Sequence, residues 1–384
     1  MKICHIITRM IVGGAQENTL FTLRGHLENG HETVLVTGPT TGPEGKLLEK
    51  VPLPELQVHE EPSLIRAIHP AQDLRAYSRL VAYLRENRFD VVHTHSSKAG
   101  IIGRAAAWKV GIPVVAHTVH GPPFHRFEKA WKNQIYITAE RYAAKRCHRI
   151  YTVADAMTQQ FQDAKIGQAS QYKTVYSGMD LEPYLNGVRD WEGRRALGIP
   201  NDSLVVGKVA RLFELKGYEY LFEAIPKILA EVPNCYFLIV GDGLLRSQFE
   251  KQVREQGITD HVKFTGLVPP SEVPKYTGMM DVLAHLSLRE GLPRAVVQGL
   301  ASGKPAVTFP LDGAPEIVLH EQTGLLCETE NSAAVAESIA RLLKDDALRE
   351  TYGQAGRKHA ASHWDWRHMV NEIETDYQKQ MDLK

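Results

Sequence analysis

The chain has 384 residues, of which 43% are hydrophobic, and its 45 Lys and Arg residues balance its 45 Asp and Glu residues. Because a single hydrophobic core rarely grows past roughly 250–300 residues, this length predicts two domains. The balanced charge excludes a global field that would attract nucleic acid, so we expect no nucleic-acid partner.

The cysteines and the N-terminus bear on the compartment. The four cysteines are widely spaced and form no CxxC pair: Cys4, Cys147, Cys235 and Cys327. Their apolar surroundings predict buried free thiols and a reducing compartment. The first residues are too short an apolar run for a signal peptide, and no run approaches the roughly 20 apolar residues of a membrane span. We therefore expect a cytoplasmic protein, with at most a peripheral contact on the inner face of the membrane.

Short apolar runs alternate with longer amphipathic segments along the chain, a pattern typical of strand-helix-strand units around a parallel sheet. In chain order, strands are expected at residues 2–8, 31–38, 89–95, 113–118, 149–154, 173–177, 203–210, 235–241, 262–266, 281–286, 304–309 and 323–327. The pattern predicts an α/β protein with two Rossmann-like, doubly wound parallel-sheet domains that face a central cleft.

The boundary between the domains is expected within residues 177–192, where strand alternation is lost and Gly and Pro occur. We assign residues 1–185 to an N-terminal domain and residues 186–363 to a C-terminal domain. In such sheets ligands bind outside the carboxyl ends of the strands, beside helix N-termini. Neither a complete GxGxxG motif nor a P-loop follows any of these strands, which disfavours a dehydrogenase or a P-loop kinase.

Two cations flank a predicted strand-to-helix turn in the second half of the chain. Arg211 ends the strand at 203–210, and Lys216 precedes the next helix. An Arg gives planar bidentate donors, a Lys gives a mobile charge and a helix N-terminus adds N–H groups, which together suit a diphosphate. The alternative is a surface Arg and Lys beside an ordinary turn.

A second group of candidates follows the strand at 281–286. Glu290, Gly291 and Leu292 lie in a loop before Pro293, which marks a helix start because its missing N–H costs nothing there. We expect the Glu290 carboxylate to accept sugar hydroxyls, with Gly291 and Leu292 also contacting the donor. Gln298 lies on the same predicted helix, about 7.5 Å further along it.

With these residues in place, the chain resembles retaining glycosyltransferase family 4 (glycosyl transferase group 1), of the GT-B fold, over nearly its whole length. Other similar segments are 13–14, 117–121, 177–180, 240–243 and 313–316. The resemblance implies that Arg211 and Lys216 bind the diphosphate and that Glu290 holds the donor sugar. Gln298 departs from the family pattern, which has a second Glu at this position for the ribose; an amide offers only neutral hydrogen bonds there.

The resemblance also implies roles for glycines and for a histidine. Gly13 and Gly14 would face the diphosphate and the acceptor, Gly241 and Gly243 would contact the donor, and His120 would lie against the donor sugar. From the residues alone, the first two glycines can equally form a plain turn, and His120 can be structural. The last segment, 364–384, would be a helix that crosses back to the N-terminal domain.

No metal and no other cofactor are expected. The histidines at positions 93, 95, 117 and 120 lack a nearby Cys or carboxylate cluster, and the chain contains no Asp-x-Asp pair that would clamp a metal-bound diphosphate. By resemblance, retention of the anomeric configuration would come from same-face attack, with the leaving phosphate assisting the acceptor proton.

The implied activity is transfer of a hexose-type sugar from a nucleotide-diphosphate sugar to a glycan, lipid-linked or other hydroxyl acceptor, in surface polysaccharide or glycolipid assembly. Segment 122–149 interleaves aromatic and basic residues, which suits an anionic membrane but also an ordinary solvated helix. Two alternatives remain for the function: a sugar-nucleotide epimerase of the same fold, and a non-catalytic sugar-nucleotide-binding protein.

Overall fold

The computed structural model describes residues 1–40 and 45–383. The chain divides into two compact units, one formed by Met1–Met179 with Trp366–Lys384 and the other by Asp180–Asp365. Residues 180–185, which the sequence pattern placed in the first domain, belong to the second unit because the short helix α7 (Glu182–Leu185) packs on α11 (Val273–Gly278) and α12 (Arg294–Ala301).

The N-terminal unit contains a seven-stranded parallel sheet in the order β3-β2-β1-β4-β5-β6-β7. Its strands are β1 (Lys2–Ile7), β2 (Glu32–Thr37), β3 (Gln57–Glu60), β4 (Val91–His95), β5 (Val114–Val119), β6 (Arg149–Thr152) and β7 (Tyr172–Thr174). Its helices are α1 (Gly14–Glu28), α2 (Leu47–Lys50), α3 (Pro70–Asn87), α4 (Ser97–Val110), α5 (Ala130–Ala144), α6 (Asp155–Asp163) and α16 (Trp366–Asp382).

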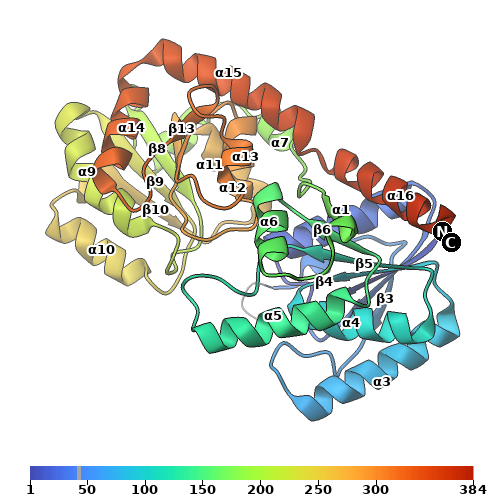
Figure 1. The fold of residues 1–384 in the computed structure, drawn as a ribbon. Coiled ribbons are helices and arrows are strands. Elements are labelled where there is room, and N and C mark those ends of the chain that lie inside the picture. The colour runs from blue at the N-terminus through green and yellow to red at the C-terminus, as the bar shows by residue number, and fades with distance from the viewer. Residues whose placement is uncertain (41–44, 384) are drawn as a thin grey trace. The chain divides into compact units, whose positions relative to one another are not determined.

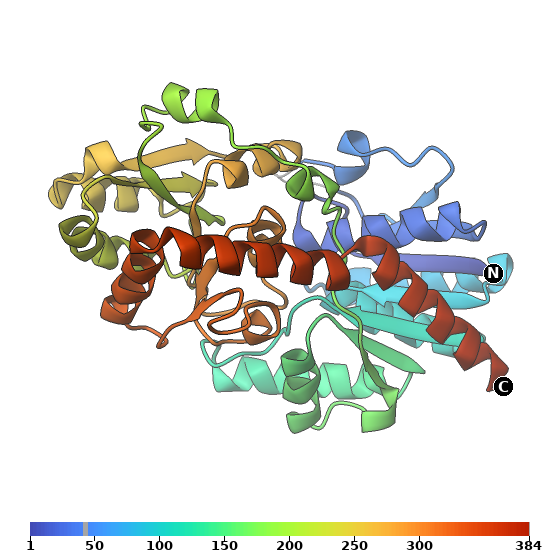
Figure 2. The same cartoon turned by 90° about the horizontal axis from the view of Figure 1, so that it is seen from above.

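Alternating side chains divide this sheet into two packed faces. Ile3 and Val91 pack against Val370 of α16, whereas Cys4 packs in the cluster that contains Leu80 of α3. Figure 1 shows the sheet between α1 and α16 on one side and α3 and α4 on the other, and α16 overlies the strands in the view of Figure 2. The face on which a side chain lies thus decides which helices it meets.

The C-terminal unit contains a six-stranded parallel sheet in the order β10-β9-β8-β11-β12-β13. Its strands are β8 (Leu204–Val209), β9 (Cys235–Val240), β10 (Val262–Gly266), β11 (Val282–His285), β12 (Ala306–Thr308) and β13 (Gly324–Leu326). Its remaining helices are α8 (Trp191–Ala196), α9 (Tyr218–Glu231), α10 (Arg246–Glu255), α13 (Ala314–Ile317), α14 (Ser332–Lys344) and α15 (Asp346–His363).

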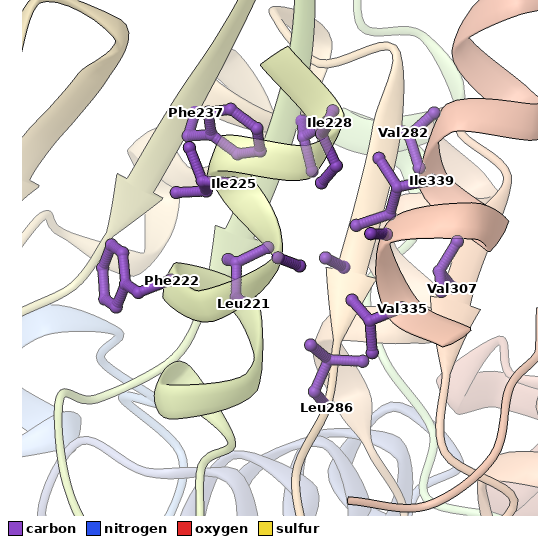
Figure 3. Close-up of a cluster of buried hydrophobic side chains, with 14 of the residues drawn as sticks. Leu221, Phe222, Ile225, Ile228, Phe237, Val282, Leu286, Val307, Val335 and Ile339 are labelled. Atoms are coloured by element: carbon purple, nitrogen blue, oxygen red, sulfur yellow. The ribbon is translucent and has the colours of Figure 1, made fainter. Parts of the chain in front are cut away.

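The core of this unit lies between the sheet and two amphipathic helices (Figure 3). Leu221 and Ile225 of α9 meet Val335 and Ile339 of α14 over Val282 of β11, and all five are fully buried. Each pair is spaced four residues apart, which places both members on one helix face. Strand β11 pairs directly with β8 in this sheet, so the loops that follow the two strands also lie side by side.

The predicted two-domain, doubly wound α/β architecture is confirmed, and the sequence pattern predicts every described strand except β3. Strand β3 pairs only with β2 at the edge of its sheet, and its apolar residue Val58 is 51% exposed. A strand that buries so little carries no apolar run. Within the described residues, no helix is long and apolar enough to cross a membrane.

Candidate functional site

The loop that carries Lys216 is fixed by the end of β11. The loop residue Leu215 accepts hydrogen bonds from the Leu288 amide at 2.8 Å and from Ser287 Oγ at 3.1 Å. Gly217 has a φ of 64°, and a Cβ there would lie 1.8 Å from the carbonyl oxygen of Leu286. Only a glycine fits such a close approach, so the turn before α9 is held against the neighbouring strand.

Lys216 and Glu290 are separated by 74 residues, and their side chains meet between the loops that follow β8 and β11. Lys216 Nζ lies 2.6 Å from Glu290 Oε1, and the two side chains are 23% and 21% exposed. The amide of Glu290 donates to Asp312 Oδ2 at 2.7 Å, which fixes the loop from the other side. The sequence prediction that these two residues share one site agrees with this geometry.

His285, at the end of β11, completes the surroundings of the carboxylate. Its Nε2 lies 3.3 Å from Glu290 Oε1. Burial acts to raise the pKa of Glu290, but the contact with His285 and the charge of Lys216 outweigh it and hold the pKa well below the usual value. Glu290 therefore stays ionised throughout the physiological range and offers an acceptor for hydroxyl groups.

Arg211 does not join this pair. It follows β8 as an exposed side chain, and its guanidinium lies over the Phe213 ring, 4.9 Å from the centroid. The glycines of the β9 loop lie beside the same turn. A Cβ at Gly241 would lie 2.2 Å from the Ala210 carbonyl oxygen, and one at Gly243 would lie 2.4 Å from that of Leu212. These glycines permit close packing of the two loops, and their contact with a donor stays a prediction.

The helix after Glu290 begins where the sequence indicated. Pro293 is the N-cap of α12, whose first helical residue is Arg294. Leu292 is buried at 7% exposure, whereas Gly291 and Gln298 are half-buried. Gln298 therefore lies on the helix that starts next to the Lys216–Glu290 pair.

Lys208 is a buried cation that the sequence reasoning missed. It is fully buried on β8, its Nζ has no hydrogen-bond partner among the described residues, and it lies over the Tyr218 ring at 4.8 Å. Burial, followed by the charge of Lys216, lowers its pKa to about 7. A lone lysine in an apolar run is the sequence signal that would have found it.

In the N-terminal unit, His120 lines a pocket of about 300 Å³ at the carboxyl ends of β4 and β5. The lining residues are Ala15, Ser96, Ser97, His117, Thr118, Val119, His120, Gly121, Pro123 and Glu140. Gly13 is the N-cap of α1 in extended backbone, and Gly14 is exposed at the first helical position. Nothing in the backbone of Gly13 requires a glycine, so its predicted ligand contact is not tested by its conformation.

The histidines of this unit separate into two groups. His117 lies on the α4 face, where its Nδ1 is 2.9 Å from Thr94 Oγ1. His93 and His95 lie on the opposite face with His5, a residue that the sequence reasoning missed, and nitrogens of these three come within 4.8 Å of one another. The histidines at 93, 95 and 117 therefore do not converge on one point.

Hydrogen bonds hold every ring nitrogen of the His5, His93 and His95 group except His5 Nε2. His5 Nδ1 and His95 Nε2 are 2.9 Å apart, and His93 bonds to Tyr377 and, at 2.6 Å, to Thr118. Two nitrogens on one tetrahedral zinc, with bonds of 2.0–2.1 Å, would lie about 3.3 Å apart. The 2.9 Å separation suits a hydrogen bond between two imidazoles.

Known proteins are similar to this chain in both of its units. A family model described as Glycosyltransferase Family 4 matches residues 12–183, and one described as Glycosyl transferases group 1 matches residues 189–359. The UDP-Gal:alpha-D-GlcNAc-diphosphoundecaprenol alpha-1,3-galactosyltransferase of Escherichia coli is 27% identical over 354 residues, covering 91% of this chain and 89% of the relative. Spore coat protein SA of Bacillus subtilis is 29% identical over 343 residues, covering 85% and 88%.

Solved structures share the fold. HepE of Anabaena in complex with UDP has a TM-score of 0.83 at 23% identity and covers 99% of this chain and 100% of that one. Sucrose-phosphate synthase of Thermosynechococcus elongatus has a TM-score of 0.85 at 20% identity and covers 100% of both chains. With family models matching both units and GT-B enzymes among its structural relatives, the chain belongs to glycosyltransferase family 4, of the GT-B fold.

Proposed function

We propose that this protein transfers a hexose-type sugar from a nucleotide-diphosphate sugar to a hydroxyl acceptor, with retention of the anomeric configuration and without a divalent metal. The observation that carries the proposal is the Lys216–Glu290 pair at the ends of β8 and β11, with Nζ and Oε1 2.6 Å apart. A cation for a phosphate and an ionised carboxylate for sugar hydroxyls are the two groups that a sugar diphosphate needs.

Sugar transfer separates charge, and the C-terminal unit would have to stabilise it. The bond from the anomeric carbon to the diphosphate oxygen breaks, the acceptor oxygen bonds to that carbon, and the acceptor proton passes to the leaving diphosphate. Positive charge develops on the sugar ring and negative charge on the phosphate. Lys216, Arg211 and the amides at the start of α9 would stabilise the phosphate, and fixed donors of this kind are worth several kcal/mol.

The acceptor would bind to the N-terminal unit. The Escherichia coli relative is named for a diphosphoundecaprenol-linked acceptor, which supports a lipid-linked glycan as the acceptor class. By family resemblance, Gly13 and Gly14 would contact the diphosphate and acceptor, and His120 would contact the donor sugar.

The surface of α5 suits an anionic lipid membrane. Trp131, Ile135 and Tyr142 are exposed by 60%, 54% and 49% at positions of one helix face. Arg146 lies over the Tyr142 ring at 3.7 Å, and Glu140 is buried against Arg104, 2.7 Å away, so it does not oppose the basic surface. Exposed aromatic side chains with adjacent cations are typical of helices that lie at a membrane interface.

Thermal-shift measurements with UDP, GDP and ADP sugars test donor binding. A ligand at 100 times its Kd stabilises the folded protein by about 2.7 kcal/mol, so one nucleotide class should raise the Tm. Lys216→Ala should weaken that nucleotide about tenfold or more, whereas Lys275→Ala, at an exposed lysine paired with Asp190, should leave binding unchanged. No shift with any nucleotide sugar would contradict the proposal.

Transfer itself is tested with the donor so identified and a lipid-linked glycan. We expect a product with the donor's anomeric configuration, formed equally well in the presence of EDTA. Turnover of the donor to a changed sugar nucleotide without an acceptor would indicate the epimerase alternative, and binding without turnover would indicate a sugar-nucleotide-binding protein.

Cosedimentation with vesicles tests the membrane contact separately. The protein should bind vesicles that contain anionic lipid and not those of neutral lipid, and 0.5 M salt should weaken binding. Trp131→Ser should reduce binding more than Leu74→Ser, a change at a 66% exposed side chain on α3. Equal binding by both variants would contradict the assignment of α5.

A further inference from the structure

Three histidines of the N-terminal unit form a continuous hydrogen-bonded series that we name the histidine chain: His5, His95 and His120. His5 Nδ1 lies 2.9 Å from His95 Nε2, and His95 Nδ1 lies 3.1 Å from His120 Nε2. The rings of each pair are nearly parallel, at 12° and 24°, with centroids 5.1 Å and 5.3 Å apart. The histidine chain ends at His120, which lines the pocket at the carboxyl ends of β4 and β5.

The sheet register brings the first two members together. His5 of β1 pairs with His93 of β4, and because side chains alternate, His95 projects on the same face. Both His5 and His95 are fully buried. Burial, together with the neighbouring histidines, lowers the pKa of each well below the usual value, so both rings are neutral at physiological pH.

A neutral imidazole has one N–H and one lone pair, so the hydrogen bonds of the histidine chain can run in either of two directions. In the first direction, His120 donates to His95 and His95 donates to His5, so His5 Nε2 carries a hydrogen. In the other, His5 donates from Nδ1, and His5 Nε2 carries only a lone pair. Within the described residues, His5 Nε2 has no hydrogen-bond partner. Orphaned buried N–H groups are rarer than unused acceptors, which favours the second direction.

The neighbour on α1 supports this choice. His26 Nδ1 lies 2.6 Å from Glu374 Oε1 and donates to that carboxylate. Burial lowers the pKa of His26, so the ring is neutral and its Nε2 carries a lone pair. The rings of His5 and His26 are 5.2 Å apart, yet no hydrogen bond joins their Nε2 atoms in the described structure. A hydrogen on His5 Nε2 would have had this acceptor nearby.

We propose that His5 and His95 are positioning residues that hold neutral His120 in the tautomer with its hydrogen on Nδ1. His95 Nδ1 donates to His120 Nε2, and which ring nitrogen of a histidine is protonated is set by the hydrogen bond that the other makes. His120 then acts as a hydrogen-bond donor through Nδ1, and its Nε2 is not available as a base. The expected effect of this tautomer on sugar transfer rests on the proposed function. The tautomer itself can be tested whether or not the protein transfers a sugar.

Nitrogen NMR of the full chain labelled with ¹⁵N-histidine tests the tautomer directly. The resonances of His120 are identified by their loss in His120→Asn. We expect a protonated Nδ1 and an unprotonated Nε2 in the wild-type protein without ligand. Protonation at Nε2, or a stoichiometric metal ion bound to His5 and His95 in the purified protein, would overturn the proposal.

A pair of variants tests the role of His95. The amide nitrogen of His95→Asn can replace the Nδ1 donor, whereas His95→Leu removes it. His95→Leu should change the His120 nitrogen shifts and lower kcat about tenfold with KM for the donor nearly unchanged, the effect of about one hydrogen bond. His95→Asn should keep both close to wild type.

His93→Leu provides the matched control. His93 lies on the same strand, is equally buried and stacks on His95 at 4.3 Å, but its hydrogen bonds go to Tyr377 and Thr118. The His93→Leu variant should lower the Tm as much as His95→Leu and leave the His120 resonances in place.

Unchanged His120 resonances in His95→Leu would overturn the proposal. If that variant does not fold, the wild-type and His95→Asn spectra still decide it. A correct tautomer without sugar transfer would contradict only the proposed function.

Discussion

The two units share the order of their first six strands but hold their central polar groups in different ways. In the C-terminal unit, Lys216 and Glu290 are charged, lie on loops beyond the strands and are each about one-fifth exposed. In the N-terminal unit, His5 and His95 are neutral, lie within the strands and are fully buried. Charged groups near solvent can exchange one partner for a ligand at low cost, whereas buried neutral groups keep the partners that satisfy them.

The edge formed by the carboxyl ends of the strands thus serves a different purpose in each unit. In the C-terminal unit this edge carries a charged pair, which we propose binds the donor, and in the N-terminal unit we propose that it fixes the protonation of one pocket residue, His120. If the C-terminal unit works through charged groups near solvent, changes in the charge of its side chains should alter sugar transfer, stability or nucleotide affinity.

Glu290→Gln should have the largest effect. The amide keeps the shape of the side chain but loses the charge that pairs with Lys216 and accepts hydroxyl hydrogens most strongly. We expect kcat for sugar transfer to fall by about 10²–10³, the usual loss for one fixed group at a reacting centre. Initial rates with the donor found by thermal shift measure this.

Glu250→Gln is the matched control for that change. Its carboxylate accepts from Arg246 at 2.8 Å on the surface of α10, and loss of a surface ion pair costs about 0–1 kcal/mol. Rates should therefore stay within about twofold of wild type. Equal losses in both variants would mean that Glu290 has no special part in transfer.

Lys208→Met tests a residue that departs from this pattern, because Lys208 is a fully buried lysine in the unit whose other central charged groups lie near solvent. The pKa of Lys208 is lowered from 10.5 to about 7, mainly by burial. Between these values the unfolded chain holds a proton that the folded protein lacks, so stability rises with pH through this window. Methionine removes the penalty, and we expect Lys208→Met to be more stable at pH 7 by roughly 2–4 kcal/mol.

The gain should shrink toward zero as the pH rises through 10.5, because the lysine of the unfolded chain then also loses its proton. Urea unfolding at several pH values measures it. Lys275→Met, at a side chain that is 52% exposed, should change stability by under about 0.5 kcal/mol at any pH. A Lys208→Met protein less stable than wild type at pH 7 would show that the buried amine has a stabilising partner.

Much of the fold follows from periodicity, and the site in the C-terminal unit follows from topology. Lys216 and Glu290 come after the first and fourth strands of their unit, which are neighbours in a doubly wound sheet of the order 3-2-1-4-5-6, so their meeting was predictable for a sheet of that order. Strand β3 was not predictable because it buries almost nothing. The helix α7 was assigned to the wrong unit because a short helix next to a linker shows no periodicity that reveals its packing.

The histidine chain was beyond sequence reasoning for a different reason. Which strand residues pair is set by register, and the register of β1 on β4 is what brings His5 beside His93 and His95. His117 of the neighbouring strand β5 does not join the histidine chain. Alternation places His117 on the α4 face instead, because it pairs with Thr94.

Gln298→Glu should have the smallest effect and sharpens the charged side of the comparison. Family 4 enzymes have a Glu here by resemblance, and Gln298 is half-buried on α12. A carboxylate accepts from ribose hydroxyls more strongly than an amide, by about 1 kcal/mol, so nucleoside diphosphate affinity should rise about fivefold. Titration calorimetry measures this, with Gln298→Ala expected to lose about as much. Weaker binding by Gln298→Glu would indicate that this position faces the phosphates rather than the ribose, since a second carboxylate there would repel them.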